Sequence, residues 1–265
     1  MCDKKNAKAL VCELAVNSPV NDEVFTLSFS WNGPAPKAGQ FFMVKPLRCS
    51  VFLGRPLSVA EYSASDKKVK FLVARRGKGT EELAQMLTGE KTQLTGPLGN
   101  AWADFLPENS KIALIGGGVG IAPLACLIAE QQNCDFHLYA GFRNGFRSNE
   151  EKTAMLGAAT NAKKLIIAAE DWQASQTGRN GLKGRIVDFF DEGQKYAAVF
   201  ACGPEPMLKA VKTKCEKTPC FFSLERRTAC GVGACLGCTV HTVQGNRRCC
   251  ADGPIFAAQE IIFDD

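Results

Sequence analysis

Three cysteines near the end of the chain constrain it more than any other feature. Cys230, Cys235 and Cys238 follow the spacing C-x4-C-x2-C in a loop rich in glycine and alanine. This is the plant-type run of ligands for a [2Fe-2S] cluster, and one member of the later pair Cys249-Cys250 can supply a fourth thiolate. Small residues between the ligands let backbone N–H groups approach the sulfurs of a cluster. The sequence therefore predicts a one-electron centre.

A zinc site is the main alternative, because four cysteines can also hold Zn²⁺. Structural zinc sites usually combine one C-x2-C with a second C-x2-C or with histidines. This stretch has a single C-x2-C, and the histidine nearest to it is His241. The pattern therefore favours an iron-sulfur cluster over zinc.

Composition narrows the class of protein. The 265 residues are 46% hydrophobic, enough for one large or two ordinary domains. The odd count of 13 cysteines, with no apolar leader before them, predicts reduced thiols and a cytoplasmic protein. A net charge of +5 without basic runs gives no support for nucleic-acid binding. The apolar stretch Ile112–Ala129 is broken by Gly116–Gly120 and Pro123, so no membrane span is expected.

The first part of the chain reads as short strands. Between Lys8 and Pro97, apolar residues alternate with polar ones in runs separated by Gly, Pro and Asn, which is typical of a small antiparallel barrel. One helix is expected over 81–87, with Thr80 as its N-cap and Gly89 past its end. The expected strands are 9–16, 24–29, 40–44, 56–59 and 68–73.

The hydrophobic pattern of the sequence changes after Asn100. A continuous apolar strand at 111–115 runs into Gly116-Gly-Gly-Val-Gly120 and then into a helix, the arrangement in which a dinucleotide pyrophosphate meets a helix N-terminus. Alternating strands and helices follow and predict a parallel sheet covered on both faces. The expected strands are 136–140, 164–169 and 197–201, and the expected helices lie near 150–156, 186–191 and 206–215.

Two short motifs in the barrel could also carry chemistry. Arg55-Pro-Leu-Ser58 offers a guanidinium for a diphosphate, and Gly77-Lys-Gly-Thr80 offers amides at the start of a helix. Each could equally be an ordinary turn. His137 falls within a predicted strand and is expected to be a packed side chain, so no histidine pair remains for acid–base work. Cofactors must therefore supply the chemistry.

Taken together, the motifs resemble a known family. R-P-x-S, G-x-G-T, G-P-L-G-N, G-G-G-x-G-x-A-P and C-G-P occur in the order found in ferredoxin-reductase-like flavoproteins, whose barrel holds FAD and whose α/β domain holds NAD(P)H. The tail, C-G-x-G-A-C-x-x-C and then C-x-D-G-P, is similar to that of electron-transfer subunits of type B dihydroorotate dehydrogenase. In those subunits FAD and a [2Fe-2S] cluster link NAD to FMN in a catalytic partner.

The resemblance implies three parts and assigns residues to each. These are an FAD-binding barrel at 1–105, a Rossmann-like NAD-binding α/β domain at 106–222 and a [2Fe-2S] module at 223–265. The implied FAD residues are Arg55, Pro56, Leu57, Ser58, Leu72, Val73, Ala74, Gly79 and Thr80. The implied NAD residues are Gly116, Gly117, Gly118, Gly120, Cys202, Gly203 and Pro204. The implied cluster ligands are Cys230, Cys235, Cys238 and Cys250.

The fourth ligand needs a choice between neighbours. Adjacent residues of an extended segment point to opposite sides, so only one of Cys249 and Cys250 can face the other three thiols. The resemblance selects Cys250, two residues before Asp252-Gly-Pro. The chain departs from the family at Val73-Ala74, where Tyr-Arg is common, and at Ala101-Trp102, where Gly-Phe is common; both changes bear on contacts with the flavin ring.

The resemblance implies an oxidoreductase subunit of pyrimidine biosynthesis. Electrons would pass from FMN of a dihydroorotate dehydrogenase catalytic subunit, through [2Fe-2S] and FAD, to NAD, in a heterotetramer of two plus two chains. The alternatives are an NAD(P)H reductase component that feeds a ferredoxin or an oxygenase, the small subunit of an electron-bifurcating ferredoxin:NADP enzyme, and a redox sensor. Arg143 and Arg147 could hold the 2′-phosphate of NADPH, whereas Glu170-Asp171 would favour NADH.

Overall fold

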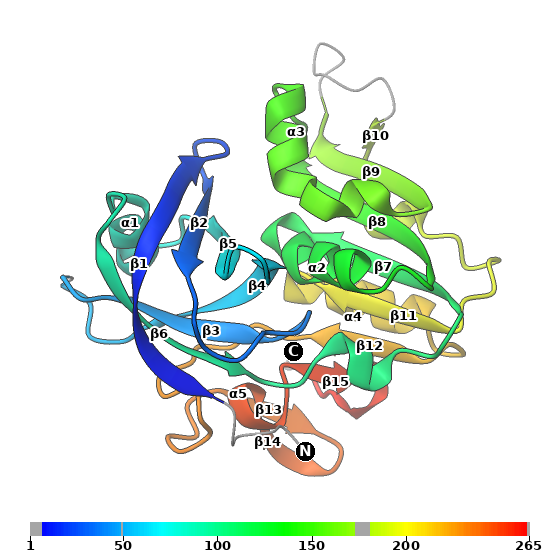
Figure 1. Cartoon of the computed structure of the whole chain (residues 1–265). Coiled ribbons are helices and arrows are strands. Elements are labelled where there is room, and N and C mark those ends of the chain that lie inside the picture. Colours follow the sequence, from blue (N-terminus) through cyan, green and yellow to red (C-terminus); the bar gives the residue numbers. More distant parts are fainter. Residues whose placement is uncertain (1–6, 49, 173–180, 264–265) are drawn as a thin grey trace.

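The computed structural model describes residues 7–48, 50–172 and 181–263 and places a barrel beside an α/β sheet (Figure 1). The barrel is closed, and its strands neighbour one another in the order β1-β2-β5-β4-β3-β6. This confirms the predicted antiparallel barrel. Its elements are β1 (Lys8–Pro19), β2 (Val24–Ser30), β3 (Phe41–Pro46), β4 (Arg55–Ser63), β5 (Lys68–Ala74), α1 (Lys78–Ala84) and β6 (Lys91–Leu98).

Large side chains fill the barrel because alternate strand residues point inward. Leu14, Phe29, Phe42 and Phe71 are fully buried, and Phe42 meets the ring of Trp31 edge-on at 4.8 Å between centroids. The predicted N-cap of the helix was wrong. Helix α1 begins after Gly77, and Thr80 lies within its first turn, where its hydroxyl donates to the carbonyl of Gly77 at 2.9 Å.

The second part is a seven-stranded sheet in the order β10-β9-β8-β7-β11-β12-β15. All pairs are parallel except the last, in which β15 runs antiparallel to β12. Among the described residues, no helix is long and apolar enough to cross a membrane. The strands are β7 (Lys111–Gly117), β8 (Asp135–Asn144), β9 (Lys164–Asp171), β10 (Gly181–Lys183), β11 (Ala198–Cys202), β12 (Cys220–Ser223) and β15 (Ile255–Ala257).

The two faces of this sheet belong to two cores. On β7, Ile112 and Leu114 pack with residues of α2, whereas Ala113 and Ile115 pack with residues of α4 on the other face. The predicted helix at 186–191 is only a 3-10 turn, η4 (Ile186–Phe189). The helical elements are η1 (Trp102–Phe105), η2 (Gly118–Ile121), α2 (Ala122–Glu130), α3 (Asn149–Leu156), η3 (Gly157–Asn161) and α4 (Glu205–Lys214).

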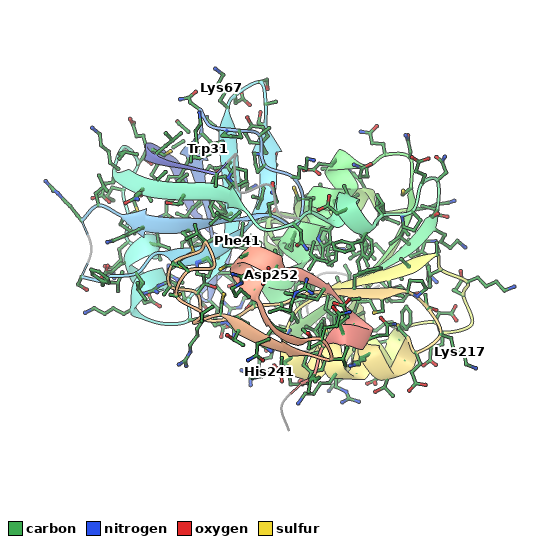
Figure 2. The ribbon with its side chains drawn as sticks, turned by 90° about the horizontal axis from the view of Figure 1, so that it is seen from below. Trp31, Phe41, Lys67, Lys217, His241 and Asp252 are labelled. Carbon is green, nitrogen blue, oxygen red and sulfur yellow. The ribbon has the colours of Figure 1, made fainter. Side chains whose placement is uncertain are left out.

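The tail lies under the junction of barrel and sheet (Figures 1 and 2). Its strand β15 extends the sheet, and the Asn100 side chain forms two hydrogen bonds with the backbone of Ile255, at 2.8 and 3.0 Å. The tail is therefore anchored to both larger parts. Besides β15 it contains β13 (Thr239–Thr242), β14 (Gly245–Arg248), α5 (Cys249–Asp252) and η5 (Ala258–Glu260).

Candidate functional site

The predicted cluster ligands lie together in the tail. The thiols of Cys230 and Cys235 are within hydrogen-bonding reach of each other, and so are those of Cys238 and Cys250. The N–H of Cys250 donates to the sulfur of Cys238 at 3.4 Å. The structure thus brings four residues from two separate segments into one loop region, with Cys235 exposed and Cys238 and Cys250 buried.

Backbone amides point at these sulfurs. The N–H of Gly233 donates to the sulfur of Cys250 at 3.1 Å, and that of Val232 lies 3.5 Å from the sulfur of Cys230. Burial acts to raise the pKa of Cys230, but N–H groups of the loop, chiefly that of Cys235, lower it to about 6. A cluster ligand must be a thiolate, so the surroundings of Cys230 favour the required form, whereas burial and the neighbouring Cys238 raise the pKa of Cys250 to about 12.

The four predicted ligands are grouped in two pairs of thiols. Among the described residues, no three His, Cys, Asp or Glu side chains converge closely enough to hold a single metal ion. The thiols instead form two pairs, Cys230 with Cys235 and Cys238 with Cys250. A [2Fe-2S] cluster takes two thiolates on each iron, whereas structural zinc needs four around one ion.

Cys249 points away from the other thiols. Its sulfur donates to the carbonyl of Leu224 at 3.2 Å, in a buried position. The prediction that Cys249 and Cys250 lie in an extended segment was wrong, because both belong to the short helix α5. Neighbouring residues on a helix are about 100° apart, so the two thiols still diverge.

The predicted flavin residues lie on β4, on β5 and in the first turn of α1, and Leu57, Leu72 and Val73 among them are buried. The guanidinium of Arg55, at the start of β4, lies directly against Gly79 in the first turn of α1. A Cβ at position 79 would overlap Nε of Arg55 and lie 2.6 Å from its Cζ. Ser58 on β4 is half-buried, and β5, which carries Leu72, Val73 and Ala74, pairs with β4. This arrangement fits a diphosphate at Arg55 and a flat ring along the strands.

The predicted dinucleotide residues come from adjacent strands. β7 ends in Gly116-Gly117, and β11 beside it ends in Cys202, which pairs with Gly116. A Cβ at Gly120 would overlap the carbonyl oxygen of Cys202, so only glycine allows this approach. Gly118 has a φ of 55°, and nothing lies within 4 Å of the place where its Cβ would stand. That leaves open space beside the loop for a phosphate group.

This loop lies where α/β sheets bind ligands. The chain leaves β7 in one direction to β8, whereas β11 lies on the other side of β7, so the ends of β7 and β11 mark the switch point of the sheet. The turn η2, which contains Gly118 and Gly120, contacts β5 of the barrel. Burial raises the pKa of Cys202, whose thiol is a neutral packed group. The structure therefore sets the loop of predicted dinucleotide residues against β5, which carries three of the predicted flavin residues.

Comparison with known proteins agrees with this geometry. The family model "Iron-sulfur cluster binding domain of dihydroorotate dehydrogenase B" matches residues 225–262, and "Oxidoreductase NAD-binding domain" matches residues 114–213. The chain is 36% identical to the dihydroorotate dehydrogenase B (NAD(+)) electron transfer subunit of Clostridium acetobutylicum, covering 94% of this chain and 95% of the relative. The chain belongs to this family of electron-transfer subunits.

Further relatives extend the match. The electron transfer subunit from Caldanaerobacter subterraneus is 34% identical, over 93% of this chain and 96% of its own length. Among solved structures, an NADH-dependent reduced ferredoxin-NADP oxidoreductase has a TM-score of 0.80 at 25% identity, covering 96% of this chain and 90% of that one. A ferredoxin NADP+ reductase from Neisseria gonorrhoeae with FAD and NADP shares the fold, with a TM-score of 0.61 over 78% and 90% of the two chains at 17% identity.

One departure from the family pattern has a structural explanation in this electron-transfer subunit. Trp102 is fully buried and stacks on Phe200 of β11, with ring centroids 4.8 Å apart. Trp102 therefore packs the segment that follows β6 of the barrel against the sheet. The role of Asn100 in holding the tail was not predicted, although Asn100 belongs to the motif G-P-L-G-N. Asn100 and Ile255 are far apart in the sequence, so no local pattern indicates their contact.

The residues considered for choosing between NADH and NADPH lie at the far edge of the sheet. Arg147 forms an ion pair with Asp22 of the barrel at 2.7 Å, and Arg143 is exposed at the end of β8. Glu170 and Asp171 are exposed at the end of β9, as predicted. Both of these acidic side chains and Arg143 are therefore accessible at the ends of neighbouring strands.

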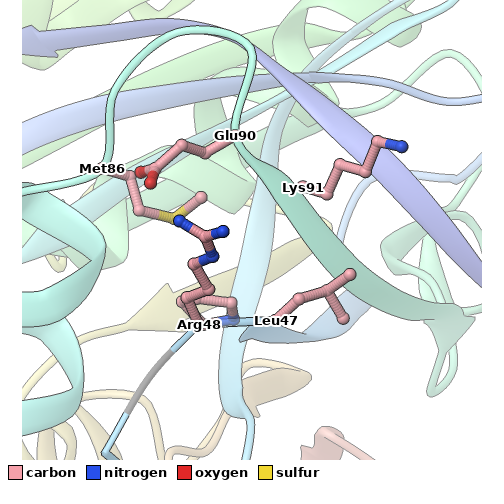
Figure 3. A pocket seen from close by; sticks show the side chains of 6 residues that line it. Leu47, Arg48, Met86, Glu90 and Lys91 are labelled. Carbon is pink, nitrogen blue, oxygen red and sulfur yellow. The ribbon is translucent and has the colours of Figure 1, made fainter.

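A pocket of about 290 Å³ on the barrel lies apart from these residues (Figure 3). Arg48 extends across it toward Met86 and Glu90. None of the residues predicted to bind a cofactor lines it, so we assign it no role. Its lining is Pro46, Leu47, Arg48, Met86, Glu90 and Lys91.

Proposed function

We propose that this protein is the electron-transfer subunit of an NAD-dependent dihydroorotate dehydrogenase in pyrimidine biosynthesis. When bound, FAD would exchange two-electron equivalents with NAD and single electrons with a [2Fe-2S] cluster that serves the catalytic partner. The division of labour follows the predicted parts, with FAD on 1–105, NAD on 106–222 and the cluster on 223–265. No side chain here is assigned to deprotonate dihydroorotate, so that step belongs to the partner.

One observation supports this function above the others: strand β12 connects the predicted dinucleotide loop with the tail that carries the predicted cluster ligands. Its last residue, Ser223, pairs with Cys202 at the dinucleotide loop, and the next residue, Leu224, accepts the thiol of Cys249. On the barrel side, a Cβ at Gly231 would lie 2.7 Å from Cγ of Met43. The cluster loop therefore contacts the barrel at Met43, and the thiol of Cys249 contacts the residue that follows β12.

The residues of this chain do the positioning. Arg55 provides a fixed positive charge for a diphosphate at the start of α1, and the strands β4 and β5 provide a flat surface for a ring. The loop at Gly116–Gly120 would hold the dinucleotide phosphates, and its contact with β5 would keep a bound dinucleotide close to the barrel. The amides of Val232 and Gly233 stabilise negative charge on the sulfurs.

The first test uses the chain alone, purified without oxygen. We expect bound FAD and about one [2Fe-2S] per chain, together with oxidation of NADH by a dye acceptor. Dihydroorotate should not be oxidised, because the chain provides flavin chemistry without a base for that substrate. Metal and acid-labile sulfide analysis, a visible spectrum and two activity assays check this. Zinc without sulfide, or turnover of dihydroorotate by this chain alone, would reject the assignment.

The partner is proposed to be an FMN-containing catalytic subunit, assembled two plus two in the cytoplasm, and to cover the cluster loop. Cys235 is exposed there, and the apolar side chains of Val232 and Leu236 are 49% and 63% exposed. Leu236 is held at a φ of 59°, a backbone conformation that non-glycine residues seldom adopt. An exposed apolar loop around a redox centre suits a protein that must come close to it.

Replacing Leu236 with aspartate should weaken binding of the catalytic subunit at least tenfold, because a carboxylate would be buried without a partner. Titration of the purified partner onto the subunit, by calorimetry or gel filtration, measures the effect. The matched control is Leu87→Asp, at a residue that is 71% exposed beyond the end of α1. Equal weakening by both substitutions, or by neither, would contradict docking on the cluster loop.

A second candidate is a reductase subunit that serves a ferredoxin-coupled enzyme. It is favoured by the TM-score of 0.80 with the NADH-dependent reduced ferredoxin-NADP oxidoreductase. The two candidates differ in what binds the cluster loop. Capture of the native protein followed by identification of the second chain and its flavin decides between them: a chain containing FMN that oxidises dihydroorotate supports the first, and a ferredoxin-reducing chain supports the second.

A further inference from the structure

Arg248 is tied to the cluster loop and to Asp252 at once. Its Nε and Nη2 donate to the two carboxylate oxygens of Asp252, at 2.9 and 3.0 Å, and its backbone N–H donates to Oδ2 at 2.8 Å. The side chains of Arg248 and Asp252 are 37% and 22% exposed. A two-pronged pair of this kind fixes the guanidinium in one orientation, which a single ion pair between mobile side chains does not.

The fixed guanidinium lies over Gly233. Its Nη1 is 3.5 Å from the carbonyl oxygen of Gly233, and a Cβ at Gly233 would lie 3.5 Å from Cδ and from Nη1 of Arg248. The N–H of the same Gly233 donates to the sulfur of Cys250 at 3.1 Å. Arg248 therefore contacts Gly233, the residue whose N–H donates to the sulfur of a predicted ligand.

We infer that Arg248, held by Asp252, is a positioning residue that raises the reduction potential of the cluster, an inference that rests on the proposed ligand set. Reduction adds one electron to a group that four thiolates already make negative. A fixed positive charge and an ordered N–H···S bond stabilise that added charge and shift the equilibrium toward the reduced form. Removal of the guanidinium should therefore lower the potential.

The neighbouring Arg247 offers a matched control. Arg247 and Arg248 are consecutive residues of β14, so their side chains leave the strand on opposite sides, and Arg247 pairs with Val240 of β13. Arg247→Met removes the same charge one residue earlier while leaving the contacts of Arg248 with Asp252 and Gly233 in place. A general effect of net charge would appear in both variants, whereas the inferred effect belongs to Arg248.

The test is an anaerobic redox titration of the loaded protein, followed by its visible absorption and its electron paramagnetic resonance signal. At the wild-type midpoint, where reduced and oxidised clusters are equal, Arg248→Met should lower the reduced-to-oxidised ratio about tenfold, which is 59 mV for one electron. Arg248→Lys keeps the charge without the two-pronged contact and should lower the ratio about threefold. Arg247→Met should change it less than twofold.

Each outcome bears on the inference. A wild-type ratio in Arg248→Met, or an equal fall in Arg247→Met, would overturn it. If Arg248→Met did not hold a cluster, Arg248→Lys would decide, and a wild-type ratio there would overturn the inference. Iron and sulfide analysis of the wild-type protein separates this from the proposed function: absence of a cluster rejects the ligand set itself, whereas a bound cluster with unshifted variants rejects only the role of Arg248.

Discussion

Cys250→Ser should abolish binding of the iron-sulfur cluster while oxidation of NADH by a dye acceptor continues. The sulfur of Cys250 receives the N–H of Gly233 and lies beside that of Cys238, so it is the member of the adjacent pair that faces the other thiols. Electron flow from NADH through FAD to a dye needs no iron and should persist. Iron and sulfide content, the visible spectrum and the paramagnetic signal of the reduced protein measure the loss.

Cys249→Ser is the control for this change. The Cys249 thiol donates to the carbonyl of Leu224, and a serine hydroxyl can donate to the same oxygen. We therefore expect an unchanged cluster in Cys249→Ser and a lost one in Cys250→Ser. Reversed phenotypes would show that the fourth ligand is Cys249. If neither change disturbed the cluster, the double substitution would show whether one thiol replaces the other.

Gly120→Ala should destabilise the sheet and disable NADH oxidation. The added Cβ would overlap the carbonyl oxygen of Cys202 and lie 2.7 Å from its carbonyl carbon. Both are backbone atoms of a central strand and cannot rotate away, so the two loops must separate. Overpacking of this kind costs about 3 kcal/mol, which corresponds to a melting temperature lower by roughly 6–12 °C for a chain of this size. Displacement of the nicotinamide should slow NADH oxidation about 100-fold.

Gly193→Ala is the control for the effect of an added methyl group on stability. A Cβ there would meet only Oδ1 of the exposed Asp191, at 3.3 Å, so the melting temperature should change little. Thermal unfolding followed by circular dichroism, together with the dye assay, compares the two variants. FAD should stay bound to Gly120→Ala because the barrel is untouched. Equal melting temperatures in the two variants would contradict the close approach of Gly120 to Cys202.

Local patterns predicted most of the elements, and the failures have identifiable causes. Both β1 and β7 were identified from their hydrophobic patterns. A strand buried on one face alternates apolar and polar residues, as β1 does, whereas a strand buried on both faces is apolar throughout, as β7 is. The N-cap was misplaced at Thr80 because α1 begins at Lys78 with Gly77 as its N-cap, and the φ of 151° at Gly77 cannot be read from cap preferences. The segment at 186–191 has apolar residues at helical spacing but forms only η4, since packing on β8 is satisfied by one turn.

Sequence alone predicted the thiolate ligands and the glycine loop, because the spacing C-x4-C-x2-C and the run Gly116–Gly120 are local patterns. Tertiary structure decided what depends on contacts between distant segments. It separated Cys249 from Cys250 through Leu224 and Gly233, and it placed Arg248 over the cluster loop. Two identical neighbouring thiols differ only in what surrounds them, and those surroundings come from other parts of the chain.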